Sequence, residues 1–230
     1  MTPAPPTAPT PADTVRKVRT ILWILIGVII ATGVISYAVF TATEPAPEAV
    51  QPAADAQLVR EDSHRVTTPA TEKAQLVEFL DFECESCRAA APLVEELKKD
   101  YGDRITFVHR YFPLPVHRNS GTAALAVGAA ARQGKYEQMN TRMFDTQPQW
   151  GEKQDSQAAL FRTYAQELGL DLEKYDATVA DEATRDRIRK DVADGAAMGV
   201  TGTPTFFLDG QKLTLNTEEQ FRQLLDDAAK

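Results

Sequence analysis

Two short stretches of almost continuous apolar residues mark the start of a folded region. Ala74–Phe82 (AQLVEFLDF) has the composition of a central strand covered on both faces, and Ile105–Tyr111 (ITFVHRY) has the same character. Between them, Arg88–Lys99 places an apolar stripe opposite a charged stripe, which is typical of an amphipathic helix. The order strand, helix, strand predicts a βαβ unit, whose parallel strands require a right-handed crossover.

The pattern then becomes helical over a long stretch. The region from about His117 to Gly199 contains no strand pattern and is rich in Ala, Glu, Gln and Arg. Its periodicity predicts helices in segments near 119–133, 134–146, 155–168, 172–180 and 182–197.

A strand, a hairpin turn and a final helix complete the pattern. Thr205–Leu208 predicts a strand, Asp209-Gly210 a turn, and Lys212–Leu215 the partner strand. Thr217 is placed to cap an amphipathic helix that runs to the end of the chain. One mixed sheet with helices on its faces accounts for the whole order, so the predicted fold class is α/β.

The uncharged run Ile21–Phe40 has the length of a membrane span. At about 1.5 Å per residue, a helix over this run is about 30 Å long, which is the thickness of a bilayer core. A cleaved signal peptide is the alternative, but its apolar region is about 7–15 residues long and ends at a small-x-small site. Because Phe40-Thr41-Ala42 matches that site poorly, an uncleaved anchor is favoured.

Flanking charge gives the orientation of this anchor. Arg16, Lys17 and Arg19 precede it, whereas no Lys or Arg follows it until Arg60. The positive-inside rule therefore places the N-terminus in the cytoplasm and the rest of the chain outside, on a single-pass protein of the cell membrane. We expect a disordered cytoplasmic tail, a transmembrane anchor, an extracytoplasmic linker rich in Pro, Ala and acid, and a folded domain, at residues 1–20, 21–40, 41–71 and 72–230.

Charge and cysteine content exclude several classes of protein. The net charge of −8 argues against a nucleic-acid binder, which would carry a basic face. The 2 cysteines are too few for a disulfide framework or a four-thiolate zinc site. They form a single CxxC, Cys84-Glu85-Ser86-Cys87, between the first predicted strand and the first helix.

This position favours redox chemistry. At a helix N-terminus, unpaired N–H groups and the helix dipole stabilise an anion, so the pKa of a thiol there is lowered. Cys84 would be the exposed nucleophile that attacks a partner's disulfide, and Cys87, one turn further, the buried thiol that resolves the mixed disulfide.

Three other interpretations of the cysteine pair compete with this one. A structural disulfide between residues three apart would close too small a loop to stabilise much. A metal site would need two more ligands, and none of the histidines, His64, His109 and His117, stands at ligand spacing. Two unrelated buried thiols are the third, but outside the cytoplasm a pair at this junction is expected to cycle between dithiol and disulfide.

The motifs around the pair resemble those of DsbA-like members of the thioredoxin superfamily, which are extracytoplasmic thiol–disulfide oxidoreductases. The matching segments occur in family order through residues 72–230: VEFLDFECESC (77–87), RYFPL (110–114), HRNSGTAALA (117–126), QGKYEQM (133–139) and GVTGTPTFFLDG (199–210). The resemblance implies a thioredoxin fold, βαβ…ββα, with an inserted all-helical subdomain at about 116–199, preceded here by one transmembrane helix.

The resemblance also assigns roles to three residues. Thr203-Pro204 matches the cis-proline of the family, which packs beside the CxxC and helps to position substrate. Sequence alone favours trans, since only about 5% of X–Pro bonds are cis. Glu78 matches a buried acid that shuttles the proton of the buried cysteine, and we expect burial to raise its pKa. A solvent-facing Glu78 on a less buried strand is the alternative.

The residues between the cysteines differ from the Pro-His of strongly oxidising family members. Glu85 adds a negative charge beside the nucleophile, and Ser86 cannot become cationic as histidine can. Because both changes disfavour the Cys84 thiolate, the sequence predicts a milder oxidant than the Pro-His enzymes.

Four other features are interpreted as structural rather than catalytic. His109 is expected at a sheet edge, His117 on the surface, and Trp150 in the core of the helical block. The Asp and Arg residues at 181–191 are interpreted as a solvated helix face.

The function expected from the sequence is that of a membrane-tethered oxidoreductase that oxidises cysteines of exported proteins. No bound cofactor or metal is expected, since the Cys84–Cys87 couple carries the electrons. The family suggests a quinone-coupled membrane oxidase as the electron acceptor. A reductase or isomerase of the same fold is one alternative, and a tethered binding protein or chaperone with an incidental CxxC is another.

Overall fold

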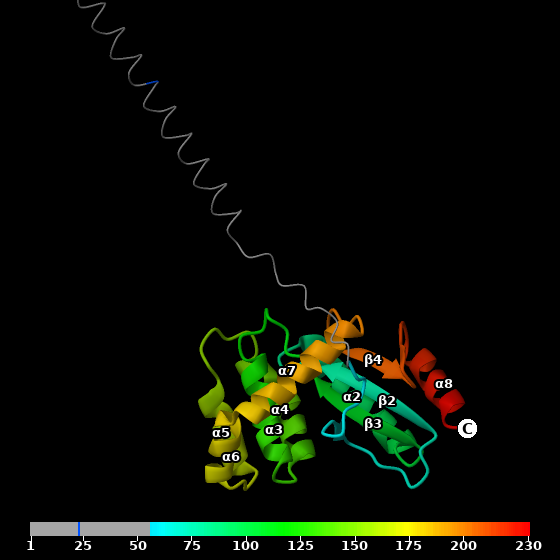
Figure 1. Ribbon diagram of the computed structural model, residues 1–230, viewed down its shortest axis with the longest axis horizontal. Coiled ribbons are helices and arrows are strands. Elements are labelled where there is room, and N and C mark those ends of the chain that lie inside the picture. The colour runs from blue at the N-terminus through cyan, green and yellow to red at the C-terminus, as the bar shows by residue number, and fades with distance from the viewer. Residues whose placement is uncertain (1–22, 24–55) are drawn as a thin grey trace, which may run out of the picture. The chain divides into compact units, whose positions relative to one another are not determined.

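The computed structural model describes Trp23 and residues 56–230 (Figure 1). The predicted tail, nearly all of the predicted anchor and most of the predicted linker lie outside the described residues. Within the described part of the chain, no helix combines the length and the apolar character that crossing a membrane requires.

One mixed five-stranded sheet forms the centre of the domain. Its order is β1-β3-β2-β4-β5, and β2 and β3 are parallel while the other pairs are antiparallel. The strands are β1 (His64–Arg65), β2 (Ala74–Leu80), β3 (Ile105–Tyr111), β4 (Thr205–Leu208) and β5 (Gln211–Lys212). The predicted α/β class and the parallel βαβ unit are therefore confirmed.

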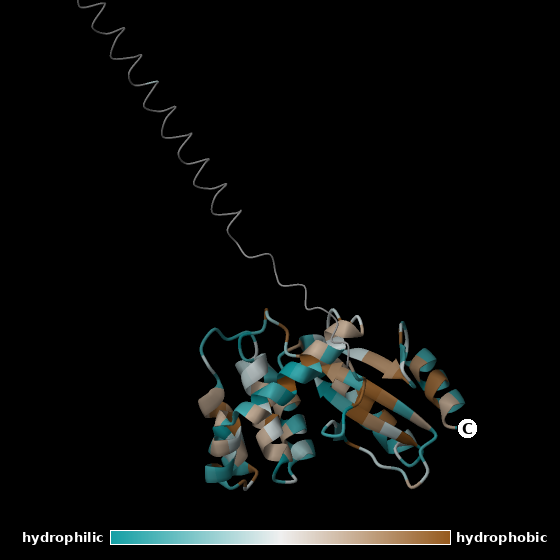
Figure 2. Cartoon of the chain, viewed as in Figure 1, coloured by the Kyte–Doolittle hydropathy of each residue, from teal (hydrophilic) through white to brown (hydrophobic). Residues whose placement is uncertain are grey.

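The two parallel strands are apolar on both sides because helices cover both faces of the sheet. On one face, Leu76 and Phe107 pack with residues of α2 (Glu85–Tyr101) and α8 (Glu218–Ala228). On the other face, Val77 and Val108 pack with residues of α7 (Glu182–Ala197). Figure 2 shows the resulting band of hydrophobic strands between more polar helices.

The predicted helical insertion is present between β3 and β4. Its helices are α3 (Ser120–Ala131), α4 (Tyr136–Trp150), α5 (Ala158–Glu167), α6 (Leu172–Ala180) and α7, close to the predicted segments. Trp150 is fully buried in its core, as predicted, and that core extends to Leu80, Phe82 and Tyr111 at the end of the sheet. The insertion is therefore packed directly against the end of the sheet from which the CxxC emerges.

The C-terminal hairpin and helix also follow the sequence pattern. Asp209 and Gly210 have φ of 47° and 84°, the left-handed conformation that a tight hairpin turn requires. The partner strand is shorter than predicted and ends at Lys212. Thr217 caps α8 by accepting a hydrogen bond from the N–H of Gln220.

The folded unit begins earlier in the chain than the predicted boundary at residue 72. β1 pairs with β3, so that His64 lies opposite His109, and Leu58 and Val59 pack against the core. Arg110 donates hydrogen bonds to the carbonyl oxygens of Gln57 and Leu58, which fixes this segment onto the domain. The proline- and acid-rich composition of this segment suggested a linker. Its C-terminal end is nevertheless part of the domain, because a few apolar side chains and the buried Arg110 bind it to the core.

The expectation of a fully solvated face at 181–191 is wrong for one residue. Asp191 is 1% exposed, and its carboxylate accepts hydrogen bonds from the Arg110 guanidinium at 2.6 Å and from the Tyr111 N–H at 3.0 Å. Arg110, itself buried, also donates to Asp194 at 2.6 Å. A charge run cannot reveal which of its members meets a buried counterion.

Candidate active site

The CxxC lies where the tight turn after β2 leads into α2. Cys84 is the N-cap residue of α2, with extended φ and ψ of −72° and 123°, and Cys87 lies in the first helical turn. Cys84 retains 8% exposure and Cys87 only 1%, and both are free thiols. Cys84 is therefore buried rather than exposed as expected, but it keeps more exposure than Cys87, in the order expected of a nucleophile and a resolving thiol.

The surroundings of Cys84 favour its thiolate. Its pKa is lowered to about 5, first by a hydrogen bond from the Cys87 thiol. Burial acts in the opposite direction, while a hydrogen bond with Thr203 and the N–H groups of Cys87 and Ser86 lower the pKa further. The N-terminus of α2 thus acts on Cys84 as predicted, through backbone donors.

The side chains of the two residues between the cysteines contribute little to the low pKa of Cys84. Glu85 and Ser86 are both exposed. The backbone of Ser86, rather than its hydroxyl, stabilises the thiolate, and Glu85 is not among the main influences on the pKa of Cys84. The predicted effect of the spacer on the reduction potential stays a prediction.

Cys87 has the opposite environment. Burial raises its pKa, and the neighbouring Cys84 and the Glu78 carboxylate raise it further. The N–H of Asp81 lies 3.4 Å from its Sγ and is the main opposing influence. At neutral pH the pair therefore consists of an anionic sulfur at Cys84 and a protonated sulfur at Cys87.

Glu78 is buried in the middle of β2, as predicted, with 5% exposure. Burial raises its pKa to about 8, and Glu95 adds to this while Lys98 opposes it. Its charge acts on Cys87 and raises the pKa of that thiol. The role itself stays a prediction.

The interpretation of His109 as a sheet-edge residue is wrong. β3 is flanked by β1 and β2, and His109 is 3% exposed opposite Glu78, with Nε2 at 3.5 Å from the Glu78 carboxylate. Burial lowers its pKa to about 3, so the ring is neutral at physiological pH, and Nδ1 lies 2.7 Å from the Tyr136 hydroxyl. Alternation along a strand could not distinguish an edge from the penultimate position, because β1 came from the segment interpreted as linker.

The sheet register brings the proline loop to the cysteines. β2 and β4 are antiparallel, with Phe79 opposite Thr205, so the chain just before β4 meets the chain just after β2. The Thr203-Pro204 bond is cis, as the resemblance implied and sequence alone did not. The Thr203 carbonyl oxygen lies 3.3 Å from the Cys84 Sγ.

Sequence reasoning missed the part played by His117. Its Nδ1 lies 2.7 Å from Oδ2 of Asp81, a residue 1% exposed in the turn that leads to Cys84. Burial lowers the pKa of His117, but the hydrogen bond to Asp81 and the charges of Asp81, Cys84 and Glu83 outweigh it, so the pKa is raised overall. Its spacing from the CxxC in sequence carries no signal.

Gln147 of α4 was also missed. Its side-chain amide donates to the carbonyl oxygens of Phe82 and Cys84 at 2.8 and 2.9 Å, and its oxygen accepts from Arg88 at 3.0 Å. The helical insertion is therefore hydrogen-bonded both to the turn before the cysteines and to the start of α2. A glutamine in a polar helical block gives no sign of this in the sequence.

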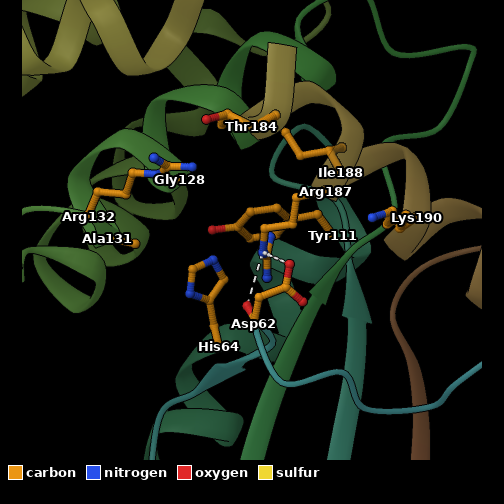
Figure 3. Close-up of a pocket in the computed structure, with 11 residues that line it drawn as sticks. Asp62, His64, Tyr111, Gly128, Ala131, Arg132, Thr184, Arg187, Ile188 and Lys190 are labelled. Carbon is orange, nitrogen blue, oxygen red and sulfur yellow. Dashed lines mark hydrogen bonds and ion pairs between the residues drawn. The ribbon is translucent and has the colours of Figure 1, made fainter. Parts of the chain in front are cut away.

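A separate hollow of about 490 Å³ lies between the edge of the sheet, α3 and α7 (Figure 3). His64, Tyr111 and Arg187 surround it, and Arg187 donates to the Asp62 carbonyl oxygen at 3.1 Å. None of its lining residues belongs to the CxxC or to the proline loop. Among the described residues, no group of three or more His, Cys, Asp or Glu side chains is arranged to hold a metal ion.

Comparison with known proteins places this geometry in a family. The model of a thioredoxin family matches residues 66–227. A thioredoxin-like oxidoreductase from Silicibacter pomeroyi is 24% identical, with a TM-score of 0.64 over 76% of this chain and 96% of that one. α-DsbA1 from Wolbachia pipientis is 19% identical, with a TM-score of 0.62 over 74% of this chain and 92% of that one. BdbD from Bacillus subtilis is 15% identical, with a TM-score of 0.58 over 71% and 91%.

Curated relatives match over part of their length only. The Na(+)/H(+) antiporter NhaA 1 from Mycobacterium sp. (strain KMS) is 36% identical over 142 residues, 60% of this chain and 22% of the antiporter. NhaA 3 from Salinispora tropica is 37% identical over 152 residues, 66% of this chain and again 22% of the antiporter. The chain thus spans about a fifth of the length of these relatives.

Proposed function

The chain belongs to the thioredoxin family and has the fold of DsbA-like proteins, and from this premise we propose that it oxidises cysteine pairs in exported proteins while tethered to the membrane. Family membership, with the Cys84–Cys87 geometry, makes the chain a thiol–disulfide oxidoreductase. The oxidising direction, the substrates and the tether belong to the proposal.

The low pKa of Cys84 is the observation that supports oxidation, rather than reduction, of substrate proteins. A pKa of about 5 means that the reduced form holds a stabilised thiolate at neutral pH. A stabilised reduced form makes the disulfide form a better electron acceptor. Across thioredoxin-fold enzymes, the pKa of the reactive thiol ranges from about 7 to about 3.5 as the reduction potential ranges from about −270 to about −120 mV. We expect a potential between these limits, as the missing Pro-His spacer also suggests.

The reaction begins from the Cys84–Cys87 disulfide. A substrate thiolate attacks the Sγ of Cys84, the S–S bond breaks, and Cys87 leaves and takes up a proton because its own pKa is raised. Glu78, with a pKa of about 8, is the nearby acid that can supply this proton. The second substrate thiol then attacks the substrate sulfur of the mixed disulfide, and Cys84 leaves as its stabilised thiolate.

The products balance the electrons. The substrate dithiol loses two electrons and two protons and becomes a disulfide, while the enzyme keeps one proton on Cys87, a thiolate on Cys84, and releases the other proton. The proline loop supports substrate binding, because the Thr203 backbone lies against the Sγ of Cys84, which the substrate thiolate attacks. Reoxidation needs an electron acceptor, for which we propose a quinone-coupled membrane oxidase.

The tether rests on sequence. The run Ile21–Phe40 with its basic flank has the features of an anchor that places the domain outside the cytoplasm, where disulfides persist. The antiporters that share this region are membrane proteins by name, which is a property of those relatives. Transport is not proposed for this chain.

Trapping in cells tests both direction and substrates. We expect the wild-type pair to be mostly disulfide, and Cys87→Ser to accumulate mixed disulfides with exported proteins in the membrane fraction, because Cys84 can still form a mixed disulfide with a substrate disulfide but no Cys87 thiol remains to resolve it. Cys84→Ser is the matched control and should trap nothing. A mostly dithiol pair would favour a reductase or isomerase, and no trapped complexes, with a Cys84 pKa near 8.5, would favour a binding protein.

A further inference from the structure

The loop between β3 and α3 is tied to the three residues that precede Cys84. The N–H of Leu114 donates to Asp81 at 2.9 Å, and the N–H of Asn119 donates to the buried carboxylate of Glu83 at 2.6 Å. His117 lies between these two attachments and makes a third, from Nδ1 to Asp81 at 2.7 Å. These three hydrogen bonds fix the position of the loop, and with it the His117 imidazole, relative to the turn that leads to Cys84.

Asp81 and Glu83 belong to the same turn as the nucleophile. The carbonyl oxygen of Asp81 accepts from the N–H of Cys84 at 3.2 Å, while its carboxylate holds the ring of His117 and accepts from the N–H of Glu83 at 2.8 Å. One residue therefore positions both the sulfur and the imidazole. His117 keeps 23% side-chain exposure, so its ring is partly open to solvent while Asp81 beneath it is buried.

We propose that His117, held by Asp81, is the positioning cation that stabilises the Cys84 thiolate, in place of the histidine that the Glu-Ser spacer lacks. This inference deepens the proposed function and rests on it. In chemical terms, reduction of the disulfide places negative charge on Cys84, and a protonated imidazole nearby favours that product. The thiolate in turn favours the protonated imidazole, because such coupling is reciprocal.

The charges around His117 are consistent with a cation at this point. Asp81 contacts the ring, and the charges of Asp81, Cys84 and Glu83, in the turn and at the start of α2, all act to raise its pKa. Burial raises the pKa of Asp81 overall, although three hydrogen bonds, including that of His117, act to lower it.

The positive groups near this loop are less well placed to act on Cys84. Arg118, the next residue on the loop, is exposed. Lys153 follows α4, where its backbone carbonyl accepts from the Asn119 side chain, and it is exposed as well. Exposed side chains are screened by solvent and salt, whereas the Asp81 contact fixes the imidazole.

Histidine NMR provides a test that does not depend on activity. Burial lowers the pKa of His64 to about 2 and that of His109 to about 3, so among the 3 histidines only His117 should titrate near neutral pH. We expect its pKa to be higher in the reduced protein than in the disulfide form. In Cys84→Ser, which has no thiolate, it should equal the value of the disulfide form. The same pKa in all three proteins would overturn the proposal.

The reciprocal measurement is made on Cys84. We expect His117→Gln to raise the pKa of Cys84, followed by thiolate absorbance, and to lower the equilibrium constant for disulfide reduction about tenfold, or about 30 mV. His117→Lys should restore part of the loss, and Arg118→Gln, the matched control, should change neither quantity. Circular dichroism confirms folding of each variant.

Equal effects of His117→Gln and Arg118→Gln would mean that only general charge acts on Cys84, and would contradict the proposal. No effect of His117→Gln would contradict it as well. These measurements use purified protein, so the proposed function can fail in the trapping experiment while the coupling between His117 and Cys84 is still observed.

Discussion

At the scale of single residues, the site separates two chemically identical thiols. Cys84 sits among hydrogen-bond donors at a helix start, and Cys87 is enclosed one turn further in. The first has a pKa of about 5, and burial raises that of the second. The same separation makes Cys84 a good leaving group, whereas Cys87 is a poor nucleophile until its proton is removed.

Glu78 gives a prediction at this scale. Reoxidation requires Cys87 to lose its proton before it resolves a mixed disulfide. Glu78 has a pKa of about 8, so above that pH its carboxylate is the base that we expect to accept this proton. Glu78→Gln should slow resolution by about tenfold or more and remove the rise in rate as pH passes about 8. Stopped-flow reoxidation with glutathione disulfide measures this, with accumulation of the glutathione adduct as a second readout.

The matched control for Glu78 is the exposed Glu61, where Glu61→Gln should leave the rate and its pH dependence unchanged. If Glu78→Gln keeps the wild-type pH profile, another group accepts the proton.

At the scale of elements, the active site is built from three segments that are far apart in sequence. The turn after β2 supplies the cysteines, the loop before β4 supplies Thr203, and the loop after β3 supplies His117. Parallel pairing of β2 with β3 and antiparallel pairing of β2 with β4 bring these three segments to one end of the sheet. α4 adds Gln147, which links the helical insertion to the same end.

Gln147 gives a prediction about this link between elements. Gln147→Ala would remove the donor to the buried carbonyl oxygen of Phe82 and leave that of Cys84 with the N–H of Arg88 alone, so we expect the free energy of unfolding to fall by about 1–3 kcal/mol. Urea unfolding of the reduced protein measures this loss.

Gln154, an exposed glutamine beyond the end of α4, is the control. Gln154→Ala should change stability by less than about 0.5 kcal/mol. Equal stability of the two variants would show that the insertion holds the turn by apolar packing alone.

At the scale of the whole molecule, the redox state is coupled to folding. In the reduced protein, the pKa of Cys84 is about 5, below its ordinary value of 9.0, so the thiolate stabilises the folded state as pH rises above about 5 and this gain is complete near 9. The disulfide form has no such thiolate. The reduced form should therefore gain stability over the disulfide form with rising pH.

Thermal unfolding checks this coupling. Each 1 kcal/mol shifts the melting temperature by about 2–4 °C in a domain of this size, so at pH 7 the reduced form should melt several degrees higher, and below pH 5 this advantage should disappear. Glu78 loses its stabilising proton over about the same range. Because Cys87 is uncharged in both redox forms at these pH values, we expect this contribution to cancel in the difference. In Cys84→Ser the pH-dependent gain should be absent, and a gap that grows toward low pH would contradict the assignment.

Local pattern in the sequence carried most of the architecture. The apolar runs predicted β2 and β3, amphipathic periodicity predicted the helices of the insertion, and Asp209-Gly210 predicted the hairpin. These features succeed because a strand, a helix or a turn depends on residues within a few positions of one another. The CxxC position likewise indicated which thiol would be reactive, since a helix start is a local feature.

Tertiary structure alone decided which distant residues surround that pair. His117 was expected on the surface, His109 at an edge and Asp191 on a solvated face, yet each meets a buried partner: Asp81, Glu78 and Arg110. Such partners lie tens of residues apart, and only the order of strands in the sheet sets their separation in space. The sequence by itself therefore determined the dithiol chemistry and the elements that carry it, whereas the charges that tune the dithiol depend on strand pairing, because electrostatic coupling follows distance in space.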